Sequence, residues 1–91
     1  MTTALNSSDT AGAEMIPVLR GQIDALDEAI IRLVAERARV SRRIQTARMN
    51  AGGTRVELGR ERVVLGTYRD GLGADGAQLA EAVLAVCRGS R

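Results

Sequence analysis

The chain has 91 residues, and its 13 basic and 11 acidic side chains leave a formal net charge of +2. All the basic residues are Arg, His and Trp are absent, and Tyr68 is the one aromatic residue. This composition argues against a nucleic-acid binder, because the sequence holds neither a clustered basic stripe nor a set of stacking aromatic side chains.

The sequence carries no signal for secretion or for a membrane. No apolar run approaches the ~20 residues that a membrane span requires, and the N-terminus lacks a basic segment followed by an apolar stretch. Cys87 is the single cysteine, so no intrachain disulfide can form. We therefore expect a cytoplasmic protein.

Residues 1–13 are mostly Thr, Ala, Ser, Asn, Asp and Gly. Such a segment cannot bury enough apolar surface to order itself, so we expect a flexible tail. Residues 14–91 then form one domain, whose purely aliphatic core is small for a stable monomer. Association with a second copy is the simplest way to bury more of it.

A heptad pattern dominates the first half of the domain and predicts a helix over residues 16–48, with Pro17 in its first turn. Apolar residues follow one another there at steps of three and four, with Arg37 filling the one gap. These apolar positions, called the seam below, are Ile16, Leu19, Ile23, Leu26, Ile30, Leu33, Val40, Ile44 and Ala47. The helix would be about 50 Å long, too long to fold against the rest of so short a chain. It needs a partner helix.

Two further helices are expected, over residues 58–69 and 77–88, after glycine-rich turns at 52–53 and 71–76. The expected inward positions are Val63, Val64 and Tyr68 in the first of these, and Leu79, Val83, Leu84, Val86 and Cys87 in the second. No strand-like alternation occurs. The sequence therefore predicts an all-α fold of three helices, in the order long, short, medium.

Arg37 stands in the middle of the aliphatic seam, where a cation costs desolvation energy unless a partner satisfies it. It either reaches out to solvent and fixes the helix register, or faces a pocket that holds an anion. Arg48 favours the pocket, because it lies about 16 Å further along nearly the same helix face. Arg20 lies about 25 Å before Arg37 on a different face, so it either forms a surface salt bridge or reaches the site from another subunit.

Glu57, Arg60 and Glu61 surround the start of the second predicted helix. Acids at a helix start compensate the helix dipole without any further role. Facing Arg48, however, these three side chains would give a site anion-binding groups and hydroxyl acceptors. The sequence shows no Ser–His or Cys–His pair, no metal-ligand cluster and no phosphate-binding loop. A reaction here would need neither metal nor cofactor, and rearrangement of a dianion between fixed cations fits that condition.

Four segments resemble the AroQ-type chorismate mutases: residues 19–28, 33–37, 46–48 and 60–62. The turn at 52–55 is similar to that of the short stand-alone subclass. The resemblance implies an isomerase, an all-α dimer that converts chorismate to prephenate in phenylalanine and tyrosine biosynthesis, with no cofactor and no metal.

The resemblance also implies residue roles. Arg37 and the partner protomer's Arg20 would hold the two carboxylates of the substrate. Arg48, where many relatives have Lys, would stabilise the ether oxygen as its bond breaks. Glu61 and Glu57 would receive the ring hydroxyl, and Arg60 would help to enclose the substrate.

Many relatives place a Gln near the end of the third helix against the ether oxygen. Here that region reads Val86-Cys87-Arg88-Gly89, so no Gln is available there, and its contribution is either missing or replaced by Arg88. The short subclass further implies an activating partner, the enzyme that opens the shikimate pathway.

Two alternatives remain from the sequence. An isochorismate-pyruvate lyase would have the same fold, but such relatives tend to lack an acid at the position of Glu61. A non-catalytic helical dimerisation or regulatory module would leave Arg37 and Arg48 exposed instead of turned toward a common cavity.

The spacing of Arg20 and Arg37 also predicts how two chains would meet. A parallel pair would keep these side chains about 25 Å apart. An antiparallel, intertwined homodimer with its two-fold axis between Glu28 and Ala29 brings Arg20 of one protomer opposite Arg37 of its partner, giving two equivalent shared sites.

Overall fold

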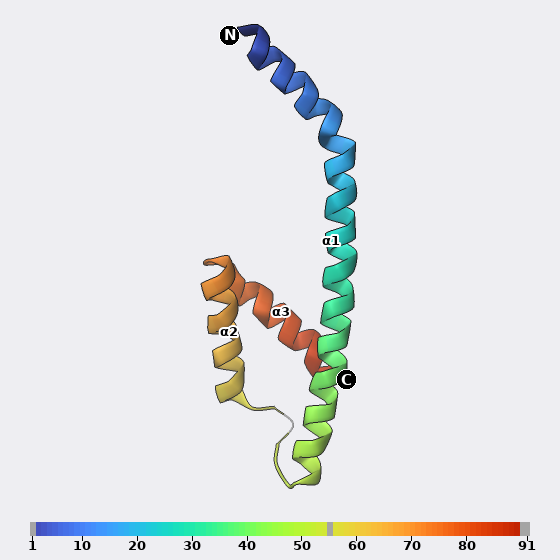
Figure 1. Cartoon of the computed structure of the whole chain (residues 1–91). Helices are drawn as coiled ribbons and strands as arrows, with labels where there is room; N and C mark the ends of the chain where they lie inside the picture. Colours follow the sequence, from blue (N-terminus) through green and yellow to red (C-terminus); the bar gives the residue numbers. More distant parts are fainter. Residues whose placement is uncertain (1, 55, 90–91) are drawn as a thin grey trace. The chain divides into compact units, whose positions relative to one another are not determined.

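The computed structural model describes the backbone of residues 2–54 and 56–89 and the side chains of residues 12–54 and 56–89. Its elements are three helices, α1 (Thr2–Asn50), α2 (Leu58–Leu72) and α3 (Gly76–Arg88), with no strand in the described part of the chain (Figure 1). The predicted all-α class and the number of helices are confirmed. The predicted order of lengths is wrong for the last two helices, because α2 continues through Gly71 and has 15 residues against 13 in α3.

The chain divides into two units, residues 1–32 and residues 33–91. The first unit is the N-terminal part of α1, in which the apolar side chains of the seam are exposed in this single chain. Pro17 lies inside α1 and not at its start, so the ladder lacks the hydrogen bond that residue 17 would donate to the carbonyl of Ala13. A flexible tail was predicted over residues 1–13. Most of the side chains of this segment lie outside the described residues, so the tail stays a prediction.

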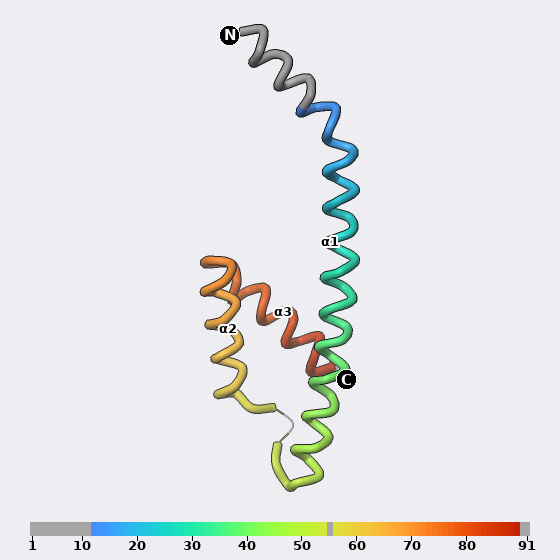
Figure 2. Tube along the Cα trace, in the orientation of Figure 1, coloured from blue at the N-terminus to red at the C-terminus, as the bar shows by residue number. Residues whose placement is uncertain are grey.

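The second unit holds the end of α1 together with α2 and α3, and its small core has two clusters. Val64 of α2 packs with Ala80 and Leu84 of α3. Ala38 of α1 packs with Val83 and Cys87 of α3. Tyr68, half-buried, packs against both clusters, so the one aromatic residue joins them. As Figure 2 shows, α3 turns back from the end of α2 and its last turn reaches α1.

The positions predicted to face inward are confirmed only in part. Val64, Val83, Leu84 and Cys87 are buried, and Tyr68 is half-buried. The positions that are instead exposed in the single chain are Val63, Leu79 and Val86. Ala80 has no exposed surface at all and was not predicted, because the apolar stripe was traced through large side chains.

A glycine turn ends α1 and returns the chain toward α2. The N–H of Gly53 donates to the carbonyl of Arg48 over 2.8 Å and that of Gly52 to Met49 over 3.0 Å, a pattern that closes many helices. Gly52 has φ +86°, a conformation that disfavours a side chain. No helix in the described part of the chain is both long enough and apolar enough to cross a membrane.

Close backbone contact joins the start of α3 to α2 at Gly76, which is buried. A Cβ built on Gly76 would collide with the carbonyl group of Tyr68. Backbone atoms cannot rotate away as a flexible side chain can, so any substitution there must push the two helices apart.

We predict that Gly76→Ala lowers the free energy of unfolding by roughly 1–3 kcal/mol, the usual cost of overpacking. Urea denaturation followed by circular dichroism measures this difference. Gly59→Ala is the matched control: its Cβ would meet nothing within 4 Å, and Ala is the better helix former. A Gly76→Ala protein as stable as the Gly59→Ala control would contradict the close contact of α2 and α3.

Candidate functional site

A cavity of about 270 Å³ lies within the second unit, between the end of α1, the start of α2 and the end of α3. It brings together six of the seven predicted site residues: Arg37, Arg48, Glu57, Arg60, Glu61 and Arg88. The seventh, Arg20, belongs to residues 1–32, and the lining comes entirely from residues 33–91.

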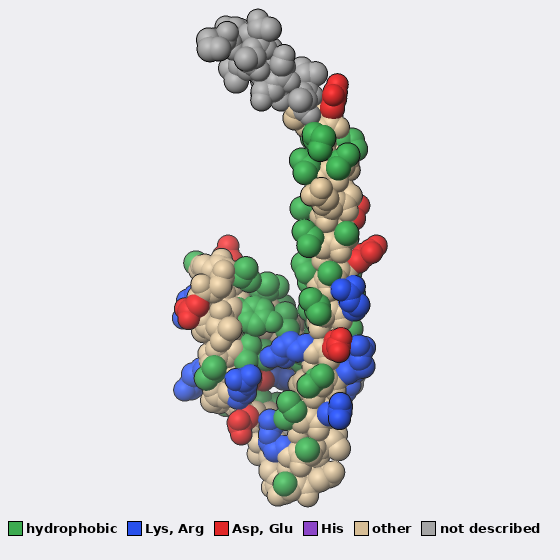
Figure 3. All heavy atoms as spheres, viewed as in Figure 1, with side chains coloured by type: hydrophobic (Ala, Val, Ile, Leu, Met, Phe, Trp, Pro, Cys, Tyr) green, Lys and Arg blue, Asp and Glu red, His purple; other side chains and the backbone are tan. Residues whose placement is uncertain are grey.

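The cavity lining is electropositive. Four guanidinium groups and two carboxylates line it, which gives a formal charge of +2. Figure 3 shows basic and acidic side chains gathered where the end of α1 faces α2 and α3. Apolar side chains complete the walls: Val40, Ile44, Val56, Val64 and Leu84. Small clefts of this kind strengthen the attraction of fixed charges for an anion, because part of the water is replaced by apolar surface. No group of three or more His, Cys, Asp or Glu that could hold a metal ion occurs among the described residues. The lining is thus suited to a small organic anion carrying two negative charges.

Arg37 is part of the cavity lining. Its side chain is half-buried, and Nη1 donates a hydrogen bond of 3.1 Å to the Sγ atom of Cys87 in α3. Of the two explanations for a cation in the seam, the geometry favours the pocket.

Arg48, in the last turn of α1, lies against the glycine turn that follows it. Its Nη1 donates to the carbonyl of Thr54 over 3.3 Å. A Cβ at Gly53 would come within 2.8 Å of the Cγ atom of Arg48, so the turn leaves room for the arginine stem only because residue 53 is Gly. The turn thus contributes to the placement of Arg48 beside the cavity.

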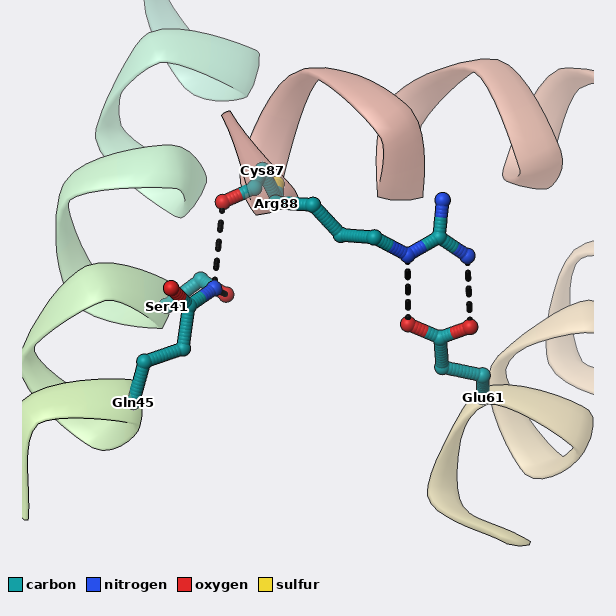
Figure 4. A network of polar contacts seen from close by, with 5 residues as sticks. All are labelled: Ser41, Gln45, Glu61, Cys87 and Arg88. Carbon is teal, nitrogen blue, oxygen red and sulfur yellow. Dashed lines mark hydrogen bonds and ion pairs between the residues drawn. The ribbon is translucent and has the colours of Figure 1, made fainter. Parts of the chain in front are cut away.

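Glu61 and Arg88 form a two-armed salt bridge across the cavity, from α2 to the last turn of α3 (Figure 4). Arg88 Nη2 donates to Oε1 over 2.6 Å and Nε donates to Oε2 over 3.1 Å. The hydrogen bonds to Glu61 raise the pKa of Arg88, burial opposes the rise, and the negative charges of Glu61 and Glu81 add to it. The guanidinium group of Arg88 therefore carries its positive charge at every pH at which the protein works.

Glu57 and Arg60 lie at the exposed side of the cavity lining. Glu57 is the N-cap residue of α2, but its side chain makes no capping hydrogen bond. Helix capping therefore does not account for the position of this carboxylate.

Two polar residues of the lining, Ser41 and Gln45, were missed by the sequence analysis. Gln45 Nε2 donates to Ser41 Oγ over 3.3 Å. It also donates to the carbonyl of Cys87 over 3.3 Å (Figure 4). No Gln was expected near the end of the third helix, and none stands there; the amide that lines the cavity comes from α1 instead. Helical periodicity carried the signal: residues 37, 41, 45 and 48 share one helix face.

Comparisons with known proteins agree on one family. The family described as "Chorismate mutase type II" matches residues 19–88. An intracellular chorismate mutase of Mycobacterium tuberculosis (strain H37Rv) is 47% identical over 74 residues, which cover 81% of this chain and 70% of the relative. The corresponding Mycolicibacterium smegmatis protein is 45% identical over 71 residues, 78% of this chain and 68% of the relative.

Among solved structures, the chain is similar to one from a non-covalent complex of DAHP synthase and chorismate mutase from Corynebacterium glutamicum, with a bound transition-state analogue. The TM-score is 0.80 at 33% sequence identity, and the match covers 86% of this chain and 94% of the other.

The salt bridge between Glu61 and Arg88 generates a prediction about stability. A double-mutant cycle with Glu61→Gln and Arg88→Met should give a coupling free energy of about 1 kcal/mol, at the upper end for partly exposed pairs because the geometry is two-armed. The coupling should shrink between 0.05 and 0.5 M salt, roughly as the screening length falls. Arg88→Lys, which keeps the charge but cannot form two parallel bonds, should retain only part of it. Urea denaturation of the four proteins gives the coupling, and a value near zero at low salt would show that the bridge is not formed in solution.

Proposed function

This chain belongs to the type II chorismate mutase family, and we propose that it rearranges chorismate to prephenate in the cavity lined by Arg37, Arg48 and Glu61. Chorismate mutases are isomerases of aromatic amino acid biosynthesis, and this chain is one of them. The alternative of a non-catalytic helical module is thereby set aside.

One observation carries the proposed site: four guanidinium groups line a single small cavity. The substrate is a dianion whose rearrangement breaks an ether bond while it makes a carbon–carbon bond. The reaction needs no nucleophile and no net proton transfer, so a protein accelerates it by holding the reactive conformer and by stabilising developing charge. Fixed cations supported by hydrogen bonds to their own protein supply both.

Arg37 and Arg48 are proposed to have different roles, because they lie at different positions along α1. Arg37, held by Cys87, is placed to bind a carboxylate, a charge that is present before and throughout the reaction. Arg48, about three turns further on, is placed to stabilise the ether oxygen, on which negative charge develops only in the transition state.

Glu61 is proposed to accept the ring hydroxyl of the substrate while it stays bonded to Arg88. Each carboxylate oxygen receives one N–H from Arg88 and keeps a second lone pair for another donor. Glu57 offers a second acceptor at the exposed side, and Arg60 adds a cation beside it. The presence of Glu61 favours the mutase over an isochorismate-pyruvate lyase of the same fold.

A second protomer is proposed to complete each site. The seam side chains of the first unit are exposed in the single chain, with Leu26 at 60% and Ile30 at 56%, and such an apolar stripe is covered in a stable protein. An antiparallel pair centred between Glu28 and Ala29 covers it and carries the partner's Arg20 to Arg37. Two cations so placed repel unless a dianion lies between them, which suits this substrate.

The comparisons support two further proposals, an activating partner and a location in the cell. The similar solved chain comes from a complex with DAHP synthase. We extend that association to this chain, with DAHP synthase, the first enzyme of the shikimate pathway, as its partner. The curated relatives are named intracellular chorismate mutases, and we extend that location to this chain as well.

The role of Arg48 can be tested with purified protein and chorismate. Arg48→Gln is expected to lower kcat by about 100-fold or more with a small change in KM, because the lost interaction belongs to the transition state. Arg48→Lys is expected to keep much of the activity, since it keeps the charge. Chorismate consumption measured over a range of concentrations separates kcat from KM.

Circular dichroism of each Arg48 variant is the control for folding. An unchanged kcat with a raised KM in Arg48→Gln would place Arg48 in substrate binding and contradict its role at the ether oxygen.

A further inference from the structure

Cys87 connects α3 to two cavity-lining side chains of α1, although the proposed reaction uses no thiol. Its Sγ atom accepts the 3.1 Å hydrogen bond from Arg37 Nη1. Its backbone carbonyl accepts the 3.3 Å bond from Gln45 Nε2 (Figure 4). Arg37 and Gln45 are two turns apart on α1, so one residue of α3 restrains two side chains in different turns of that helix.

The position of Cys87 is itself well fixed. Only 2% of the residue is exposed, and it packs with Ala38 and Val83, with Val34 and Tyr68 against the same cluster. A side chain in a closely packed cluster cannot move far without opening a void. Cys87 is therefore a rigid acceptor for the long and otherwise flexible side chain of Arg37.

A guanidinium group has five N–H donors in one plane. The contact with Cys87 engages Nη1 of Arg37 and restricts the plane of the group, and other N–H bonds remain for a ligand in the cavity. A cation whose orientation is set before the ligand arrives loses less conformational entropy on binding.

We propose that Cys87 is a positioning residue, whose thiol orients the guanidinium group of Arg37 toward a carboxylate of the substrate. The inference rests on the proposed role of Arg37 as a carboxylate-binding residue. The proposal assigns to the buried Cys87 thiol a role beyond packing.

Three substitutions separate positioning from packing. Cys87→Ser keeps an acceptor for Arg37 but is more polar, whereas Cys87→Val and Cys87→Ala are apolar and lack the acceptor. Positioning predicts that Cys87→Val and Cys87→Ala raise KM for chorismate about fivefold, a modest effect because sulfur is a weak acceptor. kcat is expected to change less than about twofold, since a carboxylate contact exists in both the ground state and the transition state.

Cys87→Ser is expected to restore KM to within about twofold of the wild-type value, because its hydroxyl accepts the same hydrogen bond. A packing role predicts the reverse order, with Cys87→Val tolerated and Cys87→Ser the most impaired. That reverse order would overturn the proposal. The comparison of Ser with Ala decides the matter even if Val is too large for the site.

Val83→Ala is the matched control in the same cluster. It removes buried apolar atoms next to Cys87, and Val83 itself is not part of the cavity lining. We expect a lower midpoint of urea denaturation with KM unchanged within about twofold. A fivefold rise of KM in Val83→Ala would show that any loosening of the cluster has the effect assigned to the thiol, and would overturn the proposal.

The Arg37→Met background distinguishes failure of this inference from failure of the proposed function. If Arg37→Met alone leaves KM unchanged, Arg37 does not bind the substrate and the proposed function is wrong at this residue. If Arg37→Met raises KM while Cys87→Ala does not, only the positioning role is wrong. The expected result is that both raise KM and that Cys87→Ala has no further effect in the Arg37→Met protein.

Discussion

The rest of the site depends on one constraint: a cation in an aliphatic helix seam costs desolvation energy unless solvent or a polar partner satisfies it. Arg37 occupies such a position, and it reaches α3 to find an acceptor in Cys87. The cost of placing Arg37, Arg48, Arg60 and Arg88 around one cavity is only partly offset by two carboxylates. The remaining positive charge of the lining is what a dianionic substrate would neutralise, so this charge imbalance favours the binding of an anion.

The last turn of α3 organises the cavity from the opposite side. Cys87 holds two side chains of α1, and Arg88, the next residue, holds Glu61 of α2. Adjacent residues of a helix point about 100° apart, so one turn can restrain both neighbouring helices. The backbone contact at Gly76 fixes the other end of α3 against α2.

Much of the fold and of the site could be predicted from the sequence, because both rest on helical periodicity. The spacing of the seam residues predicted the long helix. The position of Arg37 and Arg48 on one helix face predicted that both line the same site. What failed depended on tertiary contacts: nothing local shows that α2 continues through Gly71, that Ala80 is the most buried residue of α3, or that Gln45 faces the cavity. The amide that lines the cavity comes from α1, and the residues near the end of α3 supply none.

We propose that each site is shared by two antiparallel protomers, and complementation tests this proposal most directly. Arg20→Ala and Arg37→Ala chains, each expected to lose most of its activity at chorismate concentrations below the wild-type KM, are mixed, unfolded and refolded, and hybrid dimers are counted by native mass spectrometry. A hybrid holds one doubly damaged site and one intact site, so each should show about half of the wild-type dimer's chorismate mutase activity. Hybrids that form but show no activity would contradict the shared site.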